Sequence, residues 1–177
     1  MMKKYIENLD QIEKLSDEKI RENIEFKLFL KMQNPKRIDA MVGELDKEIK
    51  ANIDCLDCGN CCHILKIPIT KSDVERISRL ENLEPGKYVK KYTEIDTDDG
   101  LMYMKQSPCR YLDGNFCKIY AERPLACRAF PYIDKPDFTN RTNMMSAMAA
   151  ICPIVFNLLE ELKLSTDFHH NKITGTF

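Results

Sequence analysis

Four of the chain's eight cysteines fall within eight consecutive residues, and this cluster constrains the fold more than any other feature. It reads Cys55-Leu-Asp-Cys58-Gly-Asn-Cys61-Cys62. Two residues between successive cysteines allow a tight loop to turn several sulfur atoms toward one centre, and the glycine gives the loop backbone freedom. Cysteines that act only as small buried hydrophobic residues would not be concentrated in this way. The spacing therefore predicts a metal site.

The other four cysteines are spread over the second half of the chain. They are Cys109, Cys117, Cys127 and Cys152. Thiolates suit zinc or an iron–sulfur cluster and bind calcium or magnesium poorly, so we expect all eight cysteines to hold zinc or iron–sulfur. A metal centre would also offset the repulsion between crowded thiolates. Folding of the cysteine-rich part would then depend on metal.

The bulk properties of the 177-residue chain make a disulfide framework the less favoured alternative. The chain is long enough to fold around a hydrophobic core, and its first eight residues turn acidic where a signal peptide would be apolar. We expect a cytoplasmic protein, in which thiols persist unless they bind metal. A net charge of −1 and short apolar runs make nucleic acid and membrane unlikely partners.

Residues 1–52 are predicted to form a helical extension. Ser16 is expected to cap a helix that ends before Pro35. The apolar positions of this helix recur at helical spacing, at Ile20, Ile24 and Leu28. A second helix is expected to bury one apolar face, made up of Ile38, Met41, Val42, Leu45 and Ile49.

Residues 53–164 are predicted to form the cysteine-cluster domain, mostly α with a small hairpin and short strands (α+β), before a flexible tail over residues 165–177. The segment from Cys55 to Cys62 is expected to be a loop. Strands are expected over 64–69 and 101–106, and Asp113-Gly114 is typical of a hairpin turn. Helices are expected over 70–80, 85–92, 120–130 and 141–164, with Pro153 either kinking the last helix or starting its second half.

The eight cysteines can be divided between two centres. One set matches the run and the distant Cys-Pro that bacterial ferredoxins use for a [4Fe–4S] cluster. This set is Cys55, Cys58, Cys61 and Cys152. The side chains of adjacent cysteines are expected to diverge, so Cys62 is assigned to the other centre. That second set is Cys62, Cys109, Cys117 and Cys127.

Five segments carry a combined motif that is more specific than any single cysteine pair. They are Cys55 to Cys62, Pro108-Cys109-Arg110-Tyr111-Leu112, Cys117-Lys-Ile-Tyr120, Arg123-Pro124-Leu-Ala-Cys127-Arg128-Ala-Phe130-Pro131 and Cys152-Pro153. Together they resemble the YkgJ-like cysteine-cluster family, a zinc- or iron-chelating domain, over roughly residues 53–155. The resemblance implies metal binding, with iron–sulfur and zinc both open. A related domain of FliB-like flagellin lysine N-methylases implies an iron–sulfur cluster.

Polar residues beside the cysteines are weaker candidates. His63 could bind zinc or iron, but a position next to the centre is the stronger expectation. Three arginines could lower thiolate pKa values or bind an anionic partner, although pairing with carboxylates such as Glu122 and Asp113 is the more ordinary role. They are Arg110, Arg123 and Arg128.

Three functions follow from this pattern. The first is a metal-binding accessory protein that passes electrons, or helps to mature or modify a protein partner, and docks through its N-terminal helices. The second is a structural zinc module for interactions. The third is a metal-dependent protein-modifying enzyme of the lysine N-methylase type. Enzyme activity is the less favoured interpretation, because the sequence shows no hydrolase or nucleotide-binding motif and no glycine-rich turn typical of an adenosylmethionine site.

Overall fold

The computed structural model describes residues 5–170, and the chain divides into two units. The helical unit comprises the chain up to Asp54 together with the chain from Pro131 onward, and the cysteine unit is Cys55–Phe130. Within the described residues, ten α-helices and two small antiparallel sheets confirm the predicted fold class, mostly α with little β.

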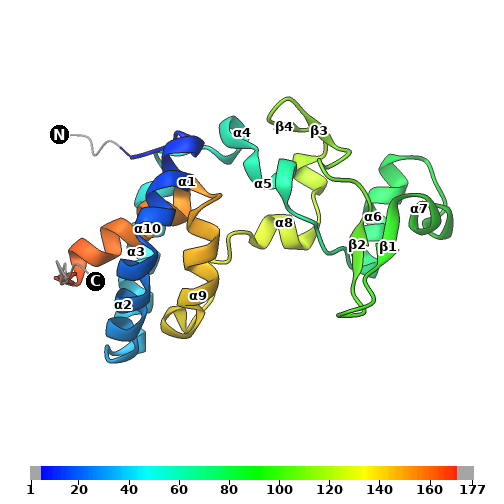
Figure 1. Cartoon of the computed structure of the whole chain (residues 1–177). Coiled ribbons are helices and arrows are strands. Elements are labelled where there is room, and N and C mark those ends of the chain that lie inside the picture. Colours follow the sequence, from blue (N-terminus) through cyan, green and yellow to red (C-terminus); the bar gives the residue numbers. More distant parts are fainter. Residues whose placement is uncertain (1–4, 171–177) are drawn as a thin grey trace, which may run out of the picture. The chain divides into compact units, whose positions relative to one another are not determined.

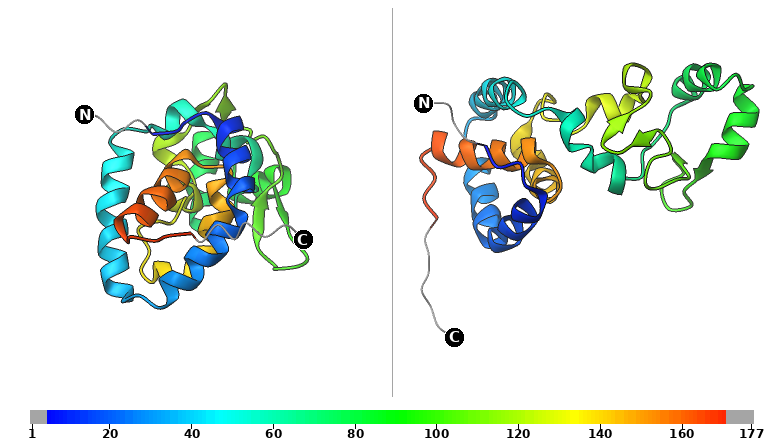
Figure 2. Two further views of the ribbon diagram at one scale, coloured as in Figure 1. Left: turned by 60° about the vertical axis from the view of Figure 1, so that its left-hand side comes forward. Right: turned by 90° about the horizontal axis from the view of Figure 1, so that it is seen from above.

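The helical unit is built around one buried helix. Its helices are α1 (Leu9–Glu18), α2 (Ile20–Lys31), α3 (Pro35–Lys50), α9 (Phe138–Ala149) and α10 (Pro153–Ser165) (Figure 1). Helix α10 packs against α3 and α9, and both views of Figure 2 show its orange-red ribbon close to the blue N-terminal helices. Its almost wholly buried side chains are Ile154, Val155, Leu158, Leu159 and Leu162. The helical unit thus has an ordinary apolar core.

The N-terminal helices are partly as predicted. Helix α3 buries Ile38, Val42, Leu45 and Ile49, which confirms its predicted face. The prediction of a helix that begins after Ser16 is wrong, because the chain forms α1 and α2 with a break at Lys19. Ser16 lies buried inside α1, and the side chain of Asn8 caps that helix by accepting from the Gln11 amide at 2.8 Å.

The apolar face expected on α2 is exposed. More than half of each of three side chains is exposed, namely Ile20, Ile24 and Leu28. The buried face instead carries Phe26 and Leu30, and one turn before Phe26 lies Glu22, which pairs with the buried Lys163 of α10 at 2.7 Å. Burying the aromatic ring while pairing the lysine stabilises this orientation of α2.

The cysteine unit consists of short elements. They are α4 (Cys55–Cys58), α5 (Asn60–Ile64), α6 (Lys71–Leu80), α7 (Pro85–Tyr92), β1 (Thr93–Ile95), β2 (Met102–Met104), β3 (Leu112–Asp113), β4 (Phe116–Cys117), the 3₁₀ turn η1 (Tyr120–Glu122) and α8 (Leu125–Ala129). Strand β1 pairs with β2 and β3 pairs with β4, both antiparallel. Helices α6 and α7 and the hairpin at Asp113-Gly114 confirm the predictions for those segments.

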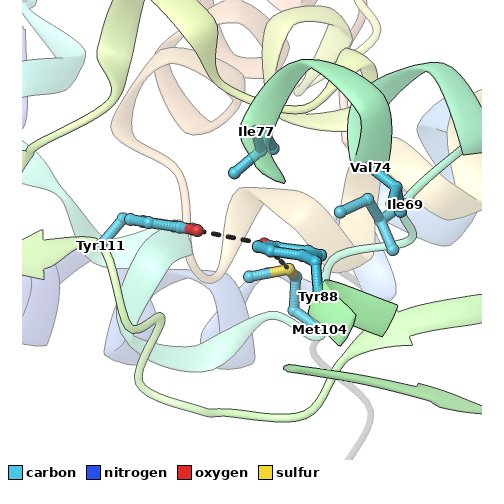
Figure 3. Packing of buried hydrophobic residues seen from close by; sticks show 6 residues of the cluster. All are labelled: Ile69, Val74, Ile77, Tyr88, Met104 and Tyr111. Atoms are coloured by element: carbon cyan, nitrogen blue, oxygen red, sulfur yellow. Dashed lines mark hydrogen bonds between the residues drawn. The ribbon is translucent and has the colours of Figure 1, made fainter. Parts of the chain in front are cut away.

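A small core holds α6, α7 and β2 together. It consists of Ile69, Val74, Ile77, Tyr88, Met104 and Tyr111 (Figure 3). The Tyr88 and Tyr111 hydroxyls hydrogen-bond each other at 3.1 Å, and the Tyr88 hydroxyl also donates to the Met104 sulfur at 3.6 Å. Both buried phenols are therefore satisfied, as a buried hydroxyl requires.

Three predicted elements differ in the structure. Residues 55–62 belong to two short helices separated by Gly59 rather than to a loop. The strand expected over 64–69 is reduced to one bridge between Pro68 and Tyr103, since proline has no N–H to continue a ladder. The helix expected over 120–130 is split at Pro124, which precedes α8 for the same reason.

The C-terminal helices α9 and α10 belong to the helical unit. The expected helix over 141–164 is two helices, with Pro153 at the start of α10. Beyond α10, Phe168 packs on the rings of Phe26 and Phe29, with centroids 5.0 and 5.4 Å away. The last part of the predicted tail, residues 171–177, lies outside the described residues. No helix in the described chain is long and apolar enough to cross a membrane.

Candidate metal centre

Six cysteines line one cavity of about 100 Å³ in the cysteine unit. They are Cys55, Cys61, Cys62, Cys109, Cys117 and Cys127. Cys58 is in the same unit but not in this lining, and Cys152 is buried in the helical unit, just before α10. All eight cysteines lie among the described residues and none forms a disulfide bond.

Gly59 places the first cysteines in the cavity wall. Its φ of +59° is the left-handed conformation that favours glycine, and it separates α4 from α5. A Cβ atom at this position would lie 2.7 Å from the Asn115 carbonyl oxygen. Any larger residue would therefore push the cysteine segment away from the β3–β4 hairpin, which carries Cys117.

Asn115, in the turn of that hairpin, fastens the two segments together. Its Nδ2 donates to the Asp57 carbonyl at 2.9 Å, and its Oδ1 lies 3.3 Å from Nε2 of His63. The Asp113-Gly114 turn was predictable, but the role of the next residue depends on a contact 58 residues away in the sequence. His63 thus contributes to holding the cysteine segment against the hairpin.

Cys109 and Cys127 reach the cavity through separate supports. The Cys109 amide donates to the Cys62 carbonyl at 2.8 Å, which joins their segments directly. Cys127 lies on α8, whose first amide, that of Leu125, donates to Asp73 at 3.0 Å. Asp73 is almost fully buried and also completes the capping box of α6 with Thr70. The sequence predicted the helix over 70–80 but not this link to α8.

Four of the thiols form an electrostatically coupled set, because each pair among them interacts. The set is Cys62, Cys109, Cys117 and Cys127. Burial raises the pKa of Cys109 and Cys117, and raises that of Cys127 to about 12, with the neighbouring thiols adding to each rise. Deprotonating all four side by side is therefore unfavourable unless a cation offsets their charge.

Cys62 differs from its neighbours. A hydrogen bond from the Cys61 thiol holds the pKa of Cys62 low, at about 7, against the opposing effect of burial. The division of all eight cysteines between two centres stays a prediction.

The six thiols line one cavity, but their side chains are not arranged to bind a metal ion as they stand. In the described part of the chain, no group of three or more His, Cys, Asp or Glu side chains converges closely enough to hold a metal ion as it stands. The donor set nevertheless fits zinc or iron–sulfur, because six sulfur ligands from four short segments line one cavity. Metal binding that is coupled to folding commonly brings such donors together.

The arginines beside the cysteines have different partners. Arg110 pairs with Glu81 and lies over the Tyr92 ring, whereas Asp113 pairs with Lys118. The carboxylate partner of Arg128 is Glu122, 3.9 Å away, as expected. Arg123, in contrast, lines the cysteine cavity.

The cavity and its cysteine pattern define the class to which the protein belongs. Residues 54–153 match the family described as "CxxCxxCC: Putative zinc- or iron-chelating domain", and this match covers more than half of the chain. The chain belongs to this family. Comparisons with curated proteins and with solved structures found no match.

Proposed function

We propose that the protein is a metal-binding accessory protein whose cysteines hold an iron–sulfur cluster or zinc. The observation that carries this proposal is the single cavity lined by six cysteines from separate segments. A bound iron–sulfur cluster would supply one-electron transfer, and zinc would supply a structural tie. Thiols at such a site persist in a reducing compartment, so we place the protein in the cytoplasm.

We further propose two centres. The coupled thiols of Cys62, Cys109, Cys117 and Cys127 support one four-ligand site in the cysteine unit. The other would be a [4Fe–4S] site, and its proposed ligands are Cys55, Cys58, Cys61 and Cys152. The short helices around Gly59 present two of the proposed [4Fe–4S] ligands to the same cavity, namely Cys55 and Cys61.

The proposed partner is another protein. The support is the exposed apolar stripe on α2, formed by Ile20, Ile24 and Leu28, because half-exposed isoleucine and leucine side chains in a row favour contact with an apolar surface. Electron transfer and maturation of the partner are the two roles that fit a cluster-bearing accessory protein.

Metal and acid-labile sulfide analysis of protein purified without oxygen tests the proposal. We expect a brown protein containing iron and sulfide in equal amounts. A colourless protein with stoichiometric zinc would favour the second candidate, a structural zinc module, which is supported by thiolates that tie separate segments together. A protein that holds neither metal would overturn both.

A further inference from the structure

Arg123 is a half-buried cation at the cysteine cavity. Its guanidinium donates to the Tyr120 carbonyl at 2.6 Å and lies over the Tyr120 ring, 3.8 Å from the centroid. Among the described residues it pairs with no carboxylate, whereas Arg76 in the same unit pairs with Asp73 at 2.7 Å. A half-buried charge without a counter-ion is costly, so this position calls for negative charge from another source.

The chain around Arg123 is held firmly by two other arginines. The Arg123 carbonyl accepts from Nη2 of Arg76 and from Nε of Arg128, each at 3.0 Å. The neighbouring acid, Glu122, is also occupied by these two arginines, at 3.2 and 3.9 Å. The backbone of Arg123 is therefore fixed, while the one acid beside it is already neutralised.

The charge of Arg123 reaches three cavity thiols. Arg123 lines the same cavity as Cys62, Cys117 and Cys127. A cation in the wall of that cavity favours the deprotonated thiol, which is the form that binds metal.

A thiolate metal centre would carry the missing negative charge. Four thiolates around one zinc ion or one [4Fe–4S] core leave a net charge of about −2. Arginine keeps its proton under all ordinary conditions, so Arg123 would act as a fixed cation beside the centre and not as a ligand.

We propose that Arg123 is the counter-cation of the metal centre and that its charge strengthens metal binding. The inference rests on the proposed function, because only a bound metal would assemble the thiolates into one anionic group. Arg123 is a positioning residue in this account: it offsets charge at the site without contacting the metal.

Three variants test the proposal by competition for metal between the intact, loaded protein and a coloured chelator. Arg123→Gln should bind metal roughly tenfold more weakly, the size of one charge-assisted hydrogen bond. Arg123→Lys should retain most of the affinity, since it keeps the charge. Arg79→Gln removes the same charge from an exposed position on α6, outside the cavity lining, and should match the wild type.

Added salt should reduce the difference in metal affinity between Arg123→Gln and the wild type, because mobile ions screen the charge of Arg123 in the wild type. The proposal is overturned if Arg123→Gln binds metal within about twofold of the wild type. It is equally overturned if Arg123→Lys is as weak as Arg123→Gln, which would indicate a packing role. A wild-type protein without metal would instead show that the proposed function itself is wrong.

Discussion

The two units of this protein achieve order in different ways. The helical unit buries long apolar faces, above all that of α10, and needs nothing but its own side chains. The cysteine unit has a small core of six buried residues, and its other described elements are short helices, a 3₁₀ turn and strands of two or three residues. A thiol-lined cavity lies in the same unit. Small regions with limited cores commonly depend on metal or cross-links. We therefore expect the folding of the cysteine unit to depend on metal far more than that of the helical unit, which contributes only Cys152 to the proposed ligands.

The largest expected effect comes from removing a buried ligand. Cys127→Ser should abolish metal binding at the proposed second centre, because serine is a poor ligand for zinc or iron–sulfur and the remaining three thiols cannot complete the site. The metal content of the purified variant measures this. Unchanged metal content would exclude Cys127 as a ligand.

A substitution in the core of the helical unit should destabilise that unit and leave the thiol site of the cysteine unit intact. Leu158 is fully buried in α10, so Leu158→Ala should lower the free energy of unfolding of that unit by about 2–5 kcal/mol. Chemical denaturation followed by circular dichroism gives the value. Metal bound at the proposed site of Cys62, Cys109, Cys117 and Cys127 should stay at the wild-type level, because all four cysteines lie in the cysteine unit. Loss of that metal would contradict this expectation.

One glycine in each unit can be replaced by alanine to compare the effect on that unit. Gly59→Ala should weaken metal binding and destabilise the cysteine unit by about 1–3 kcal/mol, because of its positive φ and the close Asn115 backbone. Gly43→Ala, inside α3 with open space around it, should instead stabilise the helical unit by about 0.5–1 kcal/mol. Thermal unfolding and metal titration of both variants test the contrast.

Sequence reasoning succeeded where short-range patterns decide the structure. The helix over 70–80, the Asp113-Gly114 turn and the buried face of α3 all follow from neighbouring residues. It failed where distant contacts decide, as with the exposed stripe on α2, whose orientation depends on Lys163 more than a hundred residues later. For the site, the cysteines were evident, whereas the contact between Gly59 and Asn115 could not be read from spacing.

The last prediction concerns Asp73, which supports α8 from α6. Burial alone would raise its pKa, but hydrogen bonds from Thr70, Arg76 and Leu125 hold the pKa below the usual value. The stability that ionised Asp73 contributes is therefore present above the unfolded-state pKa, and it is lost as pH falls through the lower folded-state pKa.

Asp73→Ala should accordingly destabilise the cysteine unit by about 1–3 kcal/mol at neutral pH, by leaving buried donors unpaired. The difference from the wild type should shrink in acid, and unfolding curves at several pH values measure it. A difference that does not change with pH would mean that the ionised carboxylate is not what stabilises this link.

Hydrogen exchange of the intact protein, loaded with metal and then stripped by a chelator, tests the contrast between the units most directly. The account predicts that stripping removes amide protection in Cys55–Phe130 and leaves the core helices α3 and α10 protected. Equal loss of protection in both units, or no change in either, would contradict it.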